Sequence, residues 1–305
     1  MTENETQSVR AVMAQIPVLA DYSGPVTRLG GLTNLVYRVG DYVLRLPGQG
    51  TEEYIDRANE AAAAKAAAAA GVSPEVMFCD PGTGVMVTRH VDAVTMTPKS
   101  FKTRKNAPAR AGHAFRKLHD SETEFPFRFE LFAMIDDYLG ILSTKDVALP
   151  PGYHDAVAQA EQVRAILDAN PVPLAPSHCD PLCENFLDDG TSMWIVDWEY
   201  SGMNDPMWDL GDLSVEGEFD QGQDEEMLSA YFNGIIRPED RSRMVIYKAM
   251  CDLLWTLWGL IQLANGNTAE DFRAYADGRF ARCRQEMASQ GFAESLAILD
   301  RARNS

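Results

Sequence analysis

Short apolar segments separated by glycine turns run from Val26 to Val91. The first turns lie at Gly30-Gly31 and Gly40-Asp41, and the segments around them are rich in β-branched and large apolar residues. This pattern predicts an antiparallel meander of three strands: Val26–Leu29, Leu35–Val39 and Tyr42–Leu46.

One helix and two more strands complete this first region. The alanine-rich stretch from Asp56 to Ala70 has the highest helix propensity available, and it stops at Gly71. Two further strands, Val76–Cys79 and Val85–Val91, flank a glycine-rich turn. We therefore predict an N-terminal lobe over residues 1–91, made of a five-stranded antiparallel sheet and one helix.

Beyond Asp92 the apolar positions recur at helical spacing, apart from a strand-rich stretch between Leu174 and Val196. The predicted helices are Ala107–His119, Leu131–Leu142, His154–Ala169, Glu225–Ala230, Arg241–Ala264 and Glu270–Ala288. We predict a mainly helical C-terminal lobe over residues 92–305, and thus an α+β chain of two lobes. A length of 305 residues suits two such units.

The composition narrows the classes of partner. With 46% hydrophobic and 24% charged residues, the chain has the usage of a folded globular protein. A formal net charge of -18 repels phosphate backbones, so we expect no nucleic-acid binding, and it favours cationic ligands weakly. The acidic run Glu216–Glu226 is interpreted as a solvated segment.

Cysteines and apolar runs indicate a cytoplasmic protein without membrane insertion. The five cysteines are scattered with no repeated spacing, which is typical of reduced thiols. No basic start followed by an apolar stretch marks a secretory signal. The most apolar stretch, Met250–Ala264, is too short to span a bilayer and contains Asp252.

The strongest chemical signal is the stretch Ser177–Leu187. It places His178, Asp180 and Asn185 in the spacing H-x-D-x-x-x-x-N of a kinase catalytic loop. Asp197 follows shortly afterwards at the end of an apolar strand, where kinases carry a metal-binding aspartate. The two signals together predict a phosphotransferase.

This residue set matches what phosphoryl transfer needs. The reaction depends on positioning and electrostatics, with a group that accepts the proton of the attacking hydroxyl. Asp180 can orient that hydroxyl and accept its proton. Asn185 and Asp197 offer the hard oxygen ligands that Mg²⁺ prefers, so ATP and Mg²⁺ are the predicted cofactors.

Other interpretations of these residues exist. Asp-Pro and Asp-Asp-Gly often mark turns, and Asp197 could be an ordinary strand-end residue. His178, Cys179 and Cys183 could be zinc ligands, but no second Cys-x-x-Cys or His pair completes a set of four.

Three segments resemble the choline/ethanolamine kinase family, whose members are related to aminoglycoside phosphotransferases: His178–Asn185, Ile195–Tyr200 and Asp209–Asp212. The resemblance implies a protein-kinase-like bilobal fold. Leu29–Val39 looks like the family's phosphate-covering hairpin. Carried over, Gly30, Gly31, Thr33 and Asn34 would line the nucleotide site, with Arg45 contacting phosphate and Glu60 as its ion-pair partner.

This chain has two features that depart from the usual pattern. Cys179 stands beside Asp180 where the family commonly has Asn, and no protein-kinase activation segment is present. The missing segment favours a small-molecule substrate over a protein.

The stretch Arg241–Ala264 carries Asp252, Trp255 and Trp258 at three-residue spacing, which puts a carboxylate and two indoles on one helix face. Indole faces attract quaternary ammonium groups. The alternative is a packed core stripe.

The resemblance extends to this region, because Leu254–Gln262 and Tyr275–Phe280 look like the segments that line the choline pocket in that family. It implies an aromatic cage with Glu216 supplying a negative charge nearby. The cage residues would be Tyr200, Trp255, Trp258 and Tyr275.

The predicted reaction is transfer of the γ-phosphoryl group of ATP to the hydroxyl of a small cationic amino alcohol, choline first and ethanolamine second. Two alternatives stay open: a related kinase acting on an aminoglycoside, thiamine or another alcohol, and a catalytically silent nucleotide-binding module. The presence of Asp180, Asn185 and Asp197 argues against a catalytically inactive module.

Overall fold

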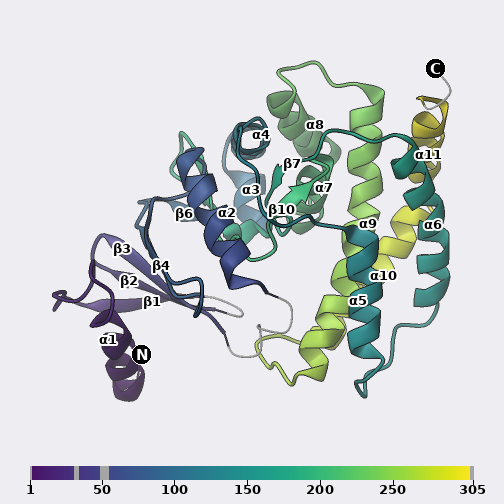
Figure 1. Ribbon diagram of the computed structural model, residues 1–305. Helices are drawn as coiled ribbons and strands as arrows, with labels where there is room; N and C mark the ends of the chain where they lie inside the picture. The colour runs from purple at the N-terminus through teal and green to yellow at the C-terminus, as the bar shows by residue number, and fades with distance from the viewer. Residues whose placement is uncertain (1, 31–33, 49–54, 303–305) are drawn as a thin grey trace.

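The computed structural model describes residues 2–30, 34–48 and 55–302. Figure 1 shows a sheet-rich N-terminal region beside a larger, mainly helical region that holds the C-terminus. The predicted α+β fold with a five-stranded N-terminal sheet and a mostly helical remainder is confirmed. The boundary at residues 91 and 92 stays a prediction.

The N-terminal sheet has the strand order β1-β2-β3-β5-β4, with antiparallel neighbours throughout. Gly40 (φ 61°) lies in the connection from β2 to β3 and Gly84 (φ 75°) in the connection from β4 to β5, and a register shift next to Gly30 distorts the end of β1. The strand bounds are β1 Val26–Gly30, β2 Leu35–Val39, β3 Tyr42–Leu46, β4 Val76–Cys79 and β5 Met86–Arg89.

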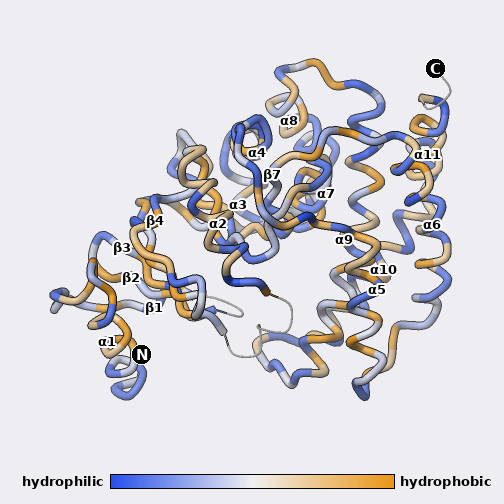
Figure 2. Tube along the Cα trace, viewed as in Figure 1, coloured by the Kyte–Doolittle hydropathy of each residue, from blue (hydrophilic) through white to orange (hydrophobic). Residues whose placement is uncertain are grey.

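Two helices cover this sheet. The helix α1 (Glu3–Met13), which the sequence pattern did not predict, buries Val9 and Met13 in one cluster with the sheet residues Tyr37 and Leu44. The predicted alanine-rich helix is α2 (Arg57–Ala69), and its small side chains are buried in the core shared with the C-terminal region. Hydrophobic residues recur along these strands and along the C-terminal helices (Figure 2).

The C-terminal region is built around α9 (Pro238–Ala264), which contacts α5, α6, α7, α10 and α11. The other helices are α3 Pro98–Thr103, α4 Ala107–His119, α5 Leu131–Leu142, α6 Tyr153–Ala169, α7 Met207–Glu216, α8 Gln221–Tyr231, α10 Phe272–Met287 and α11 Gln290–Ala302. Of these, α3, α7 and α11 were not predicted.

The helix α9 extends well beyond the apolar stretch Met250–Ala264 and is long and apolar enough to cross a membrane by length and composition alone. Most of it is instead covered by protein, since 83% of its most apolar window is buried. This is the pattern of a central core helix.

A glycine brings α7 and α9 into close contact. A Cβ added to Gly211 would lie 3.0 Å from the carbonyl oxygen of Met244 and 3.1 Å from the Cβ of Tyr247. A side chain at residue 211 would therefore push the α9 backbone away, and glycine permits the close approach without that shift.

Short strands present the predicted catalytic stretch. β7 (Ala175–Ser177) pairs with β10 (Gly202–Asn204), while β8 (Phe186–Asp188) lies between β6 (Val94–Thr95) and β9 (Met193–Ile195). The chain between β7 and β8 holds His178 to Asn185, and the chain after β9 holds Asp197. The two stretches therefore meet beside one another.

Candidate active site

A buried aspartate on α7 holds the predicted catalytic loop. Asp209 accepts hydrogen bonds from the backbone N–H groups of His178 and Cys179, at 2.7 and 2.8 Å. Cys179 has φ 68°, a left-handed conformation that costs about 1–2 kcal/mol for a residue with a side chain. The two hydrogen bonds to a carboxylate offset this cost and fix the direction of the next residue, Asp180.

Further contacts tie this loop to its surroundings. A ring nitrogen of His178, Nε2, lies 2.9 Å from the carbonyl oxygen of Val196, directly before Asp197. The indole N–H of Trp208 donates to the carbonyl oxygen of Cys179 at 3.0 Å. Burial raises the pKa of the Cys179 thiol well above its usual range, so this residue is a packing group and not a nucleophile.

Asp180 lies half-buried at the centre of the site. The amide nitrogen of Asn185 donates to the backbone carbonyl oxygen of Asp180 at 3.0 Å, which leaves the Asn185 side-chain oxygen for another partner. Desolvation, followed by the charges of Asp212 and Asp197, raises the pKa of Asp180 well above its usual range. A carboxyl with a raised pKa is a better proton acceptor when it is ionised.

Asp197 adopts a left-handed backbone conformation, φ 69°, after β9. Its Oδ1 accepts a hydrogen bond from Nη1 of Arg45 at 2.9 Å. Burial and the neighbouring Glu199 raise the pKa of Asp197 to about 7. A nearby cation would relieve this unfavourable arrangement of negative charge.

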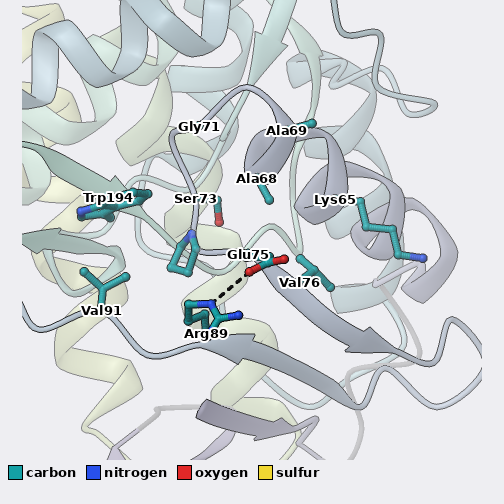
Figure 3. Close-up of a pocket in the computed structure, with 11 residues that line it drawn as sticks. Lys65, Ala68, Ala69, Gly71, Ser73, Glu75, Val76, Arg89, Val91 and Trp194 are labelled. Atoms are coloured by element: carbon teal, nitrogen blue, oxygen red, sulfur yellow. Dashed lines mark hydrogen bonds and ion pairs between the residues drawn. The ribbon is translucent and has the colours of Figure 1, made fainter. Parts of the chain in front are cut away.

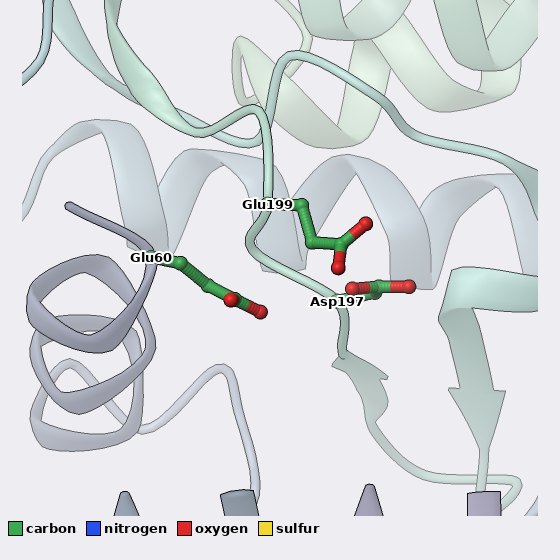
Figure 4. Close-up of side chains that lie close together, drawn as sticks. All are labelled: Glu60, Asp197 and Glu199. Atoms are coloured by element: carbon green, nitrogen blue, oxygen red, sulfur yellow. The ribbon is translucent and has the colours of Figure 1, made fainter. Parts of the chain in front are cut away.

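Asp197 belongs to a larger charged cluster, which we call the nucleotide-side cluster. It consists of three carboxylates and two guanidinium groups: Glu60, Asp197, Glu199, Arg45 and Arg57. One oxygen of each carboxylate lies within 4.8 Å of the others. Figure 4 shows Glu60 reaching from α2 toward the two acidic residues that follow β9.

The arginines bridge this cluster. Arg45 is ion-paired with Glu60, and Nη1 of Arg57 lies 2.6 Å from Oε1 of Glu199 and 2.8 Å from Oε2 of Glu60. Asn34 also donates to Oε1 of Glu199, at 3.1 Å. Arg57 and Glu199 were missed by the sequence reasoning, although the acidic residue two positions after Asp197 was a visible signal.

The oxygen-rich cluster fits a divalent cation. Two arginines face three carboxylates, so one negative charge is not matched within it. Carboxylate and amide oxygens are the ligands that Mg²⁺ prefers. Asp197 and Asn185 would hold the ion, with Glu199 beside them.

The predicted phosphate-covering residues are only partly described. Asn34 is buried, and its side-chain oxygen accepts a hydrogen bond from the backbone of Gly48 at 3.2 Å. Gly30 ends β1 and has open space around its Cα. Gly31 and Thr33 lie outside the described residues.

The four predicted cage residues form two aromatic pairs. The rings of Tyr200 and Trp255 lie 5.3 Å apart, and those of Trp258 and Tyr275 lie 5.7 Å apart, both edge to face. Gly259 makes room for the second pair, because a Cβ there would lie 2.6 Å from the Tyr275 ring.

Charged side chains surround these aromatic pairs, and we call them the acceptor-side cluster: Asp212, Glu216, Asp252, Arg279 and Arg282. Arg279 pairs with Glu216 and lies 5.0 Å from the Tyr275 ring centroid, a cation–π distance. Asp252 is bound by Arg282 at 2.6 Å and by Arg279 at 3.1 Å.

Two expectations are corrected here. The Asp252 carboxylate does not stand beside the two indoles as a free charge, since two arginines neutralise it. The run Glu216–Glu226 is not a simple solvated segment. Glu216 is mostly buried and ion-paired, and Asp224 binds Lys248 at 2.7 Å.

Similarity to known proteins agrees with this geometry. A phosphotransferase enzyme family matches residues 26–247. A crystal structure of a choline/ethanolamine kinase family protein from Mesorhizobium loti matches with a TM-score of 0.90 and 66% identity, over 96% of this chain and 98% of that one. The chain belongs to the choline/ethanolamine kinase family.

More distant family structures agree. The choline kinase LicA from Streptococcus pneumoniae matches with a TM-score of 0.80 and 25% identity, over 94% of this chain and 99% of that one. A structure of LicA in complex with AMP matches with a TM-score of 0.76 and 26% identity, over 94% and 98% of the two chains. This choline/ethanolamine kinase family protein is a kinase-like enzyme that acts on an alcohol.

A cavity of about 590 Å³ lies away from the predicted site residues. It is bordered by the end of α2, by β4 and by Trp194, and Arg89 and Glu75 form an ion pair 3.0 Å long at its edge (Figure 3). No residue that we assign to catalysis, metal or acceptor binding lines it.

Proposed function

We propose that this enzyme transfers the γ-phosphoryl group of ATP to the hydroxyl of choline, with ethanolamine as the second substrate. The observation that carries the proposal is the position of Asp180. The loop that carries Asp180 is bound by Asp209 on α7, the helix that also carries Asp212 and Glu216. His178 of the same loop contacts the carbonyl oxygen of Val196, directly before Asp197, so the loop is tied to both the acceptor-side and the nucleotide-side cluster. The family relatives, which include a choline kinase and a LicA complex with AMP, support the same substrates.

The residues take distinct parts in this proposal. The ionised Asp180 orients the acceptor hydroxyl and accepts its proton while the oxygen forms a bond to the γ-phosphorus. The bond between that phosphorus and the β–γ bridging oxygen breaks, and ADP leaves. Asn185 and Asp197 hold Mg²⁺, which supplies charge neutralisation on the phosphates when bound.

Arg45 is the phosphate-contacting cation of the proposed site. Burial opposes its charge, but Asp197 and the other two carboxylates outweigh this effect and raise the pKa of Arg45. A guanidinium held permanently charged suits a phosphate oxygen. Glu60 holds it from α2, and Gly30, Gly31, Thr33 and Asn34 would cover the phosphates.

On the acceptor side, Tyr200, Trp255, Trp258 and Tyr275 would surround the ammonium group. Quaternary ammonium ions bind well to aromatic faces because the ring quadrupole attracts a diffuse positive charge. Glu216 would add negative charge, which it shares with Arg279. This arrangement favours a small cation as the acceptor. We also propose that the enzyme is cytoplasmic.

A substrate panel tests the proposal. Purified protein with MgATP is assayed for ADP formation dependent on choline, ethanolamine, thiamine or an aminoglycoside. We expect choline to give the highest kcat/KM and ethanolamine the next highest. Turnover of thiamine or an aminoglycoside without turnover of choline would assign the enzyme to another acceptor, and no turnover with any would favour the silent nucleotide-binding module.

A further inference from the structure

The helix α7 carries three carboxylates on one face. Asp209, Asp212 and Glu216 are spaced by three and four residues, so they stack along one side of the helix. Asp209 holds the catalytic loop and Glu216 pairs with Arg279. Asp212 lies between them, fully buried, and neither task accounts for it.

Only one oxygen of Asp212 is used in a strong hydrogen bond. Its Oδ2 accepts the indole N–H of Trp255 at 3.0 Å. Its Oδ1 is buried and accepts no N–H or O–H hydrogen bond from residues 2–30, 34–48 and 55–302. The Cys251 thiol lies against this carboxylate, but it is a weak donor and also contacts the Lys248 carbonyl oxygen at 3.2 Å. A buried carboxylate oxygen without a donor is costly unless a ligand supplies one.

The charges around Asp212 do not balance. Arg282 binds Asp252, and Arg279 is divided between Asp252 and Glu216. Three carboxylates therefore face two arginines, and Asp212 is the one that forms no ion pair within 4 Å in the described chain. Burial raises the pKa of Asp212 to about 7, despite the opposing effects of Arg279 and Trp255. A bound cation would remove this penalty.

The position of Asp212 also suits contact with the ammonium group of an acceptor. It touches the indole of Trp255, whose ring packs against Tyr200. On α7 it lies between Asp209, which holds the loop that carries Asp180, and Glu216, whose partner Arg279 lies 5.0 Å from the Tyr275 ring centroid. A small acceptor bound through its hydroxyl at Asp180 would bring its ammonium group toward this carboxylate.

We propose that Asp212 is a substrate-binding residue whose buried carboxylate pairs with the single ammonium group of the acceptor and selects monocationic alcohols over neutral ones. The proposal rests on the proposed function and names the group that recognises the charge. It differs from a role in which Asp212 only holds the Trp255 indole in place.

Asp212→Asn separates the two roles, because an amide oxygen can still accept the Trp255 hydrogen bond while the charge is lost. Choline binding is measured as KM and by inhibition with the carbon isostere of choline, in which a tert-butyl group replaces the trimethylammonium group. We expect choline to bind at least about tenfold more weakly to Asp212→Asn, since a charged contact is lost. The neutral isostere should bind within about twofold of its wild-type affinity.

Asp224→Asn is the matched control. Asp224 lies on the neighbouring helix α8, and its partly buried carboxylate binds Lys248 and Ser214. Its substitution should not change the ratio of choline affinity to isostere affinity. If Asp212→Asn does not fold, as judged by its melting curve, Asp212→Ser carries the same comparison.

The outcomes are distinct. An unchanged choline-to-isostere ratio in the Asp212 variant, with wild-type protein active on choline, overturns the role of Asp212 and leaves the proposed function standing. Equal weakening of both ligands assigns Asp212 to holding Trp255 and also overturns the proposal. Wild-type protein that phosphorylates no ammonium alcohol overturns the proposed function itself, and with it the role of Asp212.

Discussion

The nucleotide-side and acceptor-side clusters have the same composition, three carboxylates and two arginines, but different construction. The first joins α2 and β3 to the chain after β9, so some of its ion pairs, such as Arg45 with Asp197, connect residues more than a hundred positions apart. The second lies entirely on α7, α9 and α10, which pack closely together. Each leaves one negative charge over, and in our proposals a metal ion compensates the first and an ammonium group the second.

The different construction of the two clusters suggests that the phosphates are bound by adaptable ion pairs and the acceptor by a rigid pocket. On the nucleotide side, the ion pairs of Arg45 and Arg57 join the sheet region to the chain after β9, and we expect them to rearrange when phosphates enter. The acceptor-side cluster is held by the packing of α7 and α10 on α9, so we expect its shape to change little when a substrate binds. Variants on the two sides should therefore fail in different kinetic parameters.

The largest effect is expected at Asp180, the proposed proton acceptor. Asp180→Ala removes the proton acceptor and should lower kcat by about two to four orders of magnitude, while ATP affinity stays nearly unchanged. Steady-state kinetics and ATP titration measure both. Asp120→Ala is the control and should be neutral, because Asp120 is an exposed residue directly after α4 that is paired only with Arg116 among the described ion pairs. Near wild-type turnover in Asp180→Ala would remove that residue from the mechanism.

On the nucleotide side, Asp197→Ala should weaken magnesium-dependent ATP binding on the order of a hundredfold, because a charged metal ligand is lost. Calorimetric titration of ATP with and without Mg²⁺ measures this. Asn185→Ala should have a milder effect, since a neutral ligand is lost. Identical ATP titrations with and without Mg²⁺ in wild type and Asp197→Ala contradict the metal assignment.

On the acceptor side, Trp255→Ala and Trp258→Ala should each weaken choline binding by up to about 2 kcal/mol, or roughly thirtyfold, with little effect on ATP. Choline should suffer more than ethanolamine, because a primary ammonium group can still donate hydrogen bonds to a carboxylate. Melting curves accompany the kinetics. A loss of stability with an unchanged choline-to-ethanolamine ratio means that the tryptophans serve only the core.

The smallest effect should come from Gly259→Ala, which pushes a methyl group against the Tyr275 ring. We expect about 1 kcal/mol, or roughly a fivefold higher KM for choline, and an unchanged KM for ATP. Gly278→Ala is a matched control on α10, because nothing lies within 4 Å of the added Cβ and alanine favours the helix. An equal effect of the two substitutions on KM would rule out a defined position of Tyr275.

Local patterns predicted most of the elements. The strands β2, β3 and β4 and the helices α4 and α5 have the predicted bounds, because alternation or helical periodicity is clear in each. The helix α7 was missed for a physical reason. Its Asp209 and Asp212 point inward to bind other groups, so its polar residues do not form a solvent face.

The residues of the candidate site also divide into those that local sequence patterns reveal and those that depend on long-range packing. Asp180, Asn185 and Asp197 are visible as a spacing within a short stretch of sequence. The pairing of Arg57 with Glu199 joins residues separated by 142 positions, and no local pattern specifies such a contact. Likewise, the free oxygen of Asp212 follows from which donors surround it, and only the packed structure defines those donors.

Gly211 limits how the substrate range of this enzyme can evolve. It sits between Asp209 and Asp212 on α7, at the point where the helix touches the backbone of α9. A side chain at this position would shift the support of the catalytic loop and the acceptor pocket in the same step. If Asp212 and Glu216 bind the acceptor as we propose, substitutions at these two residues are a more direct route to new acceptors than movement of the helix that carries them.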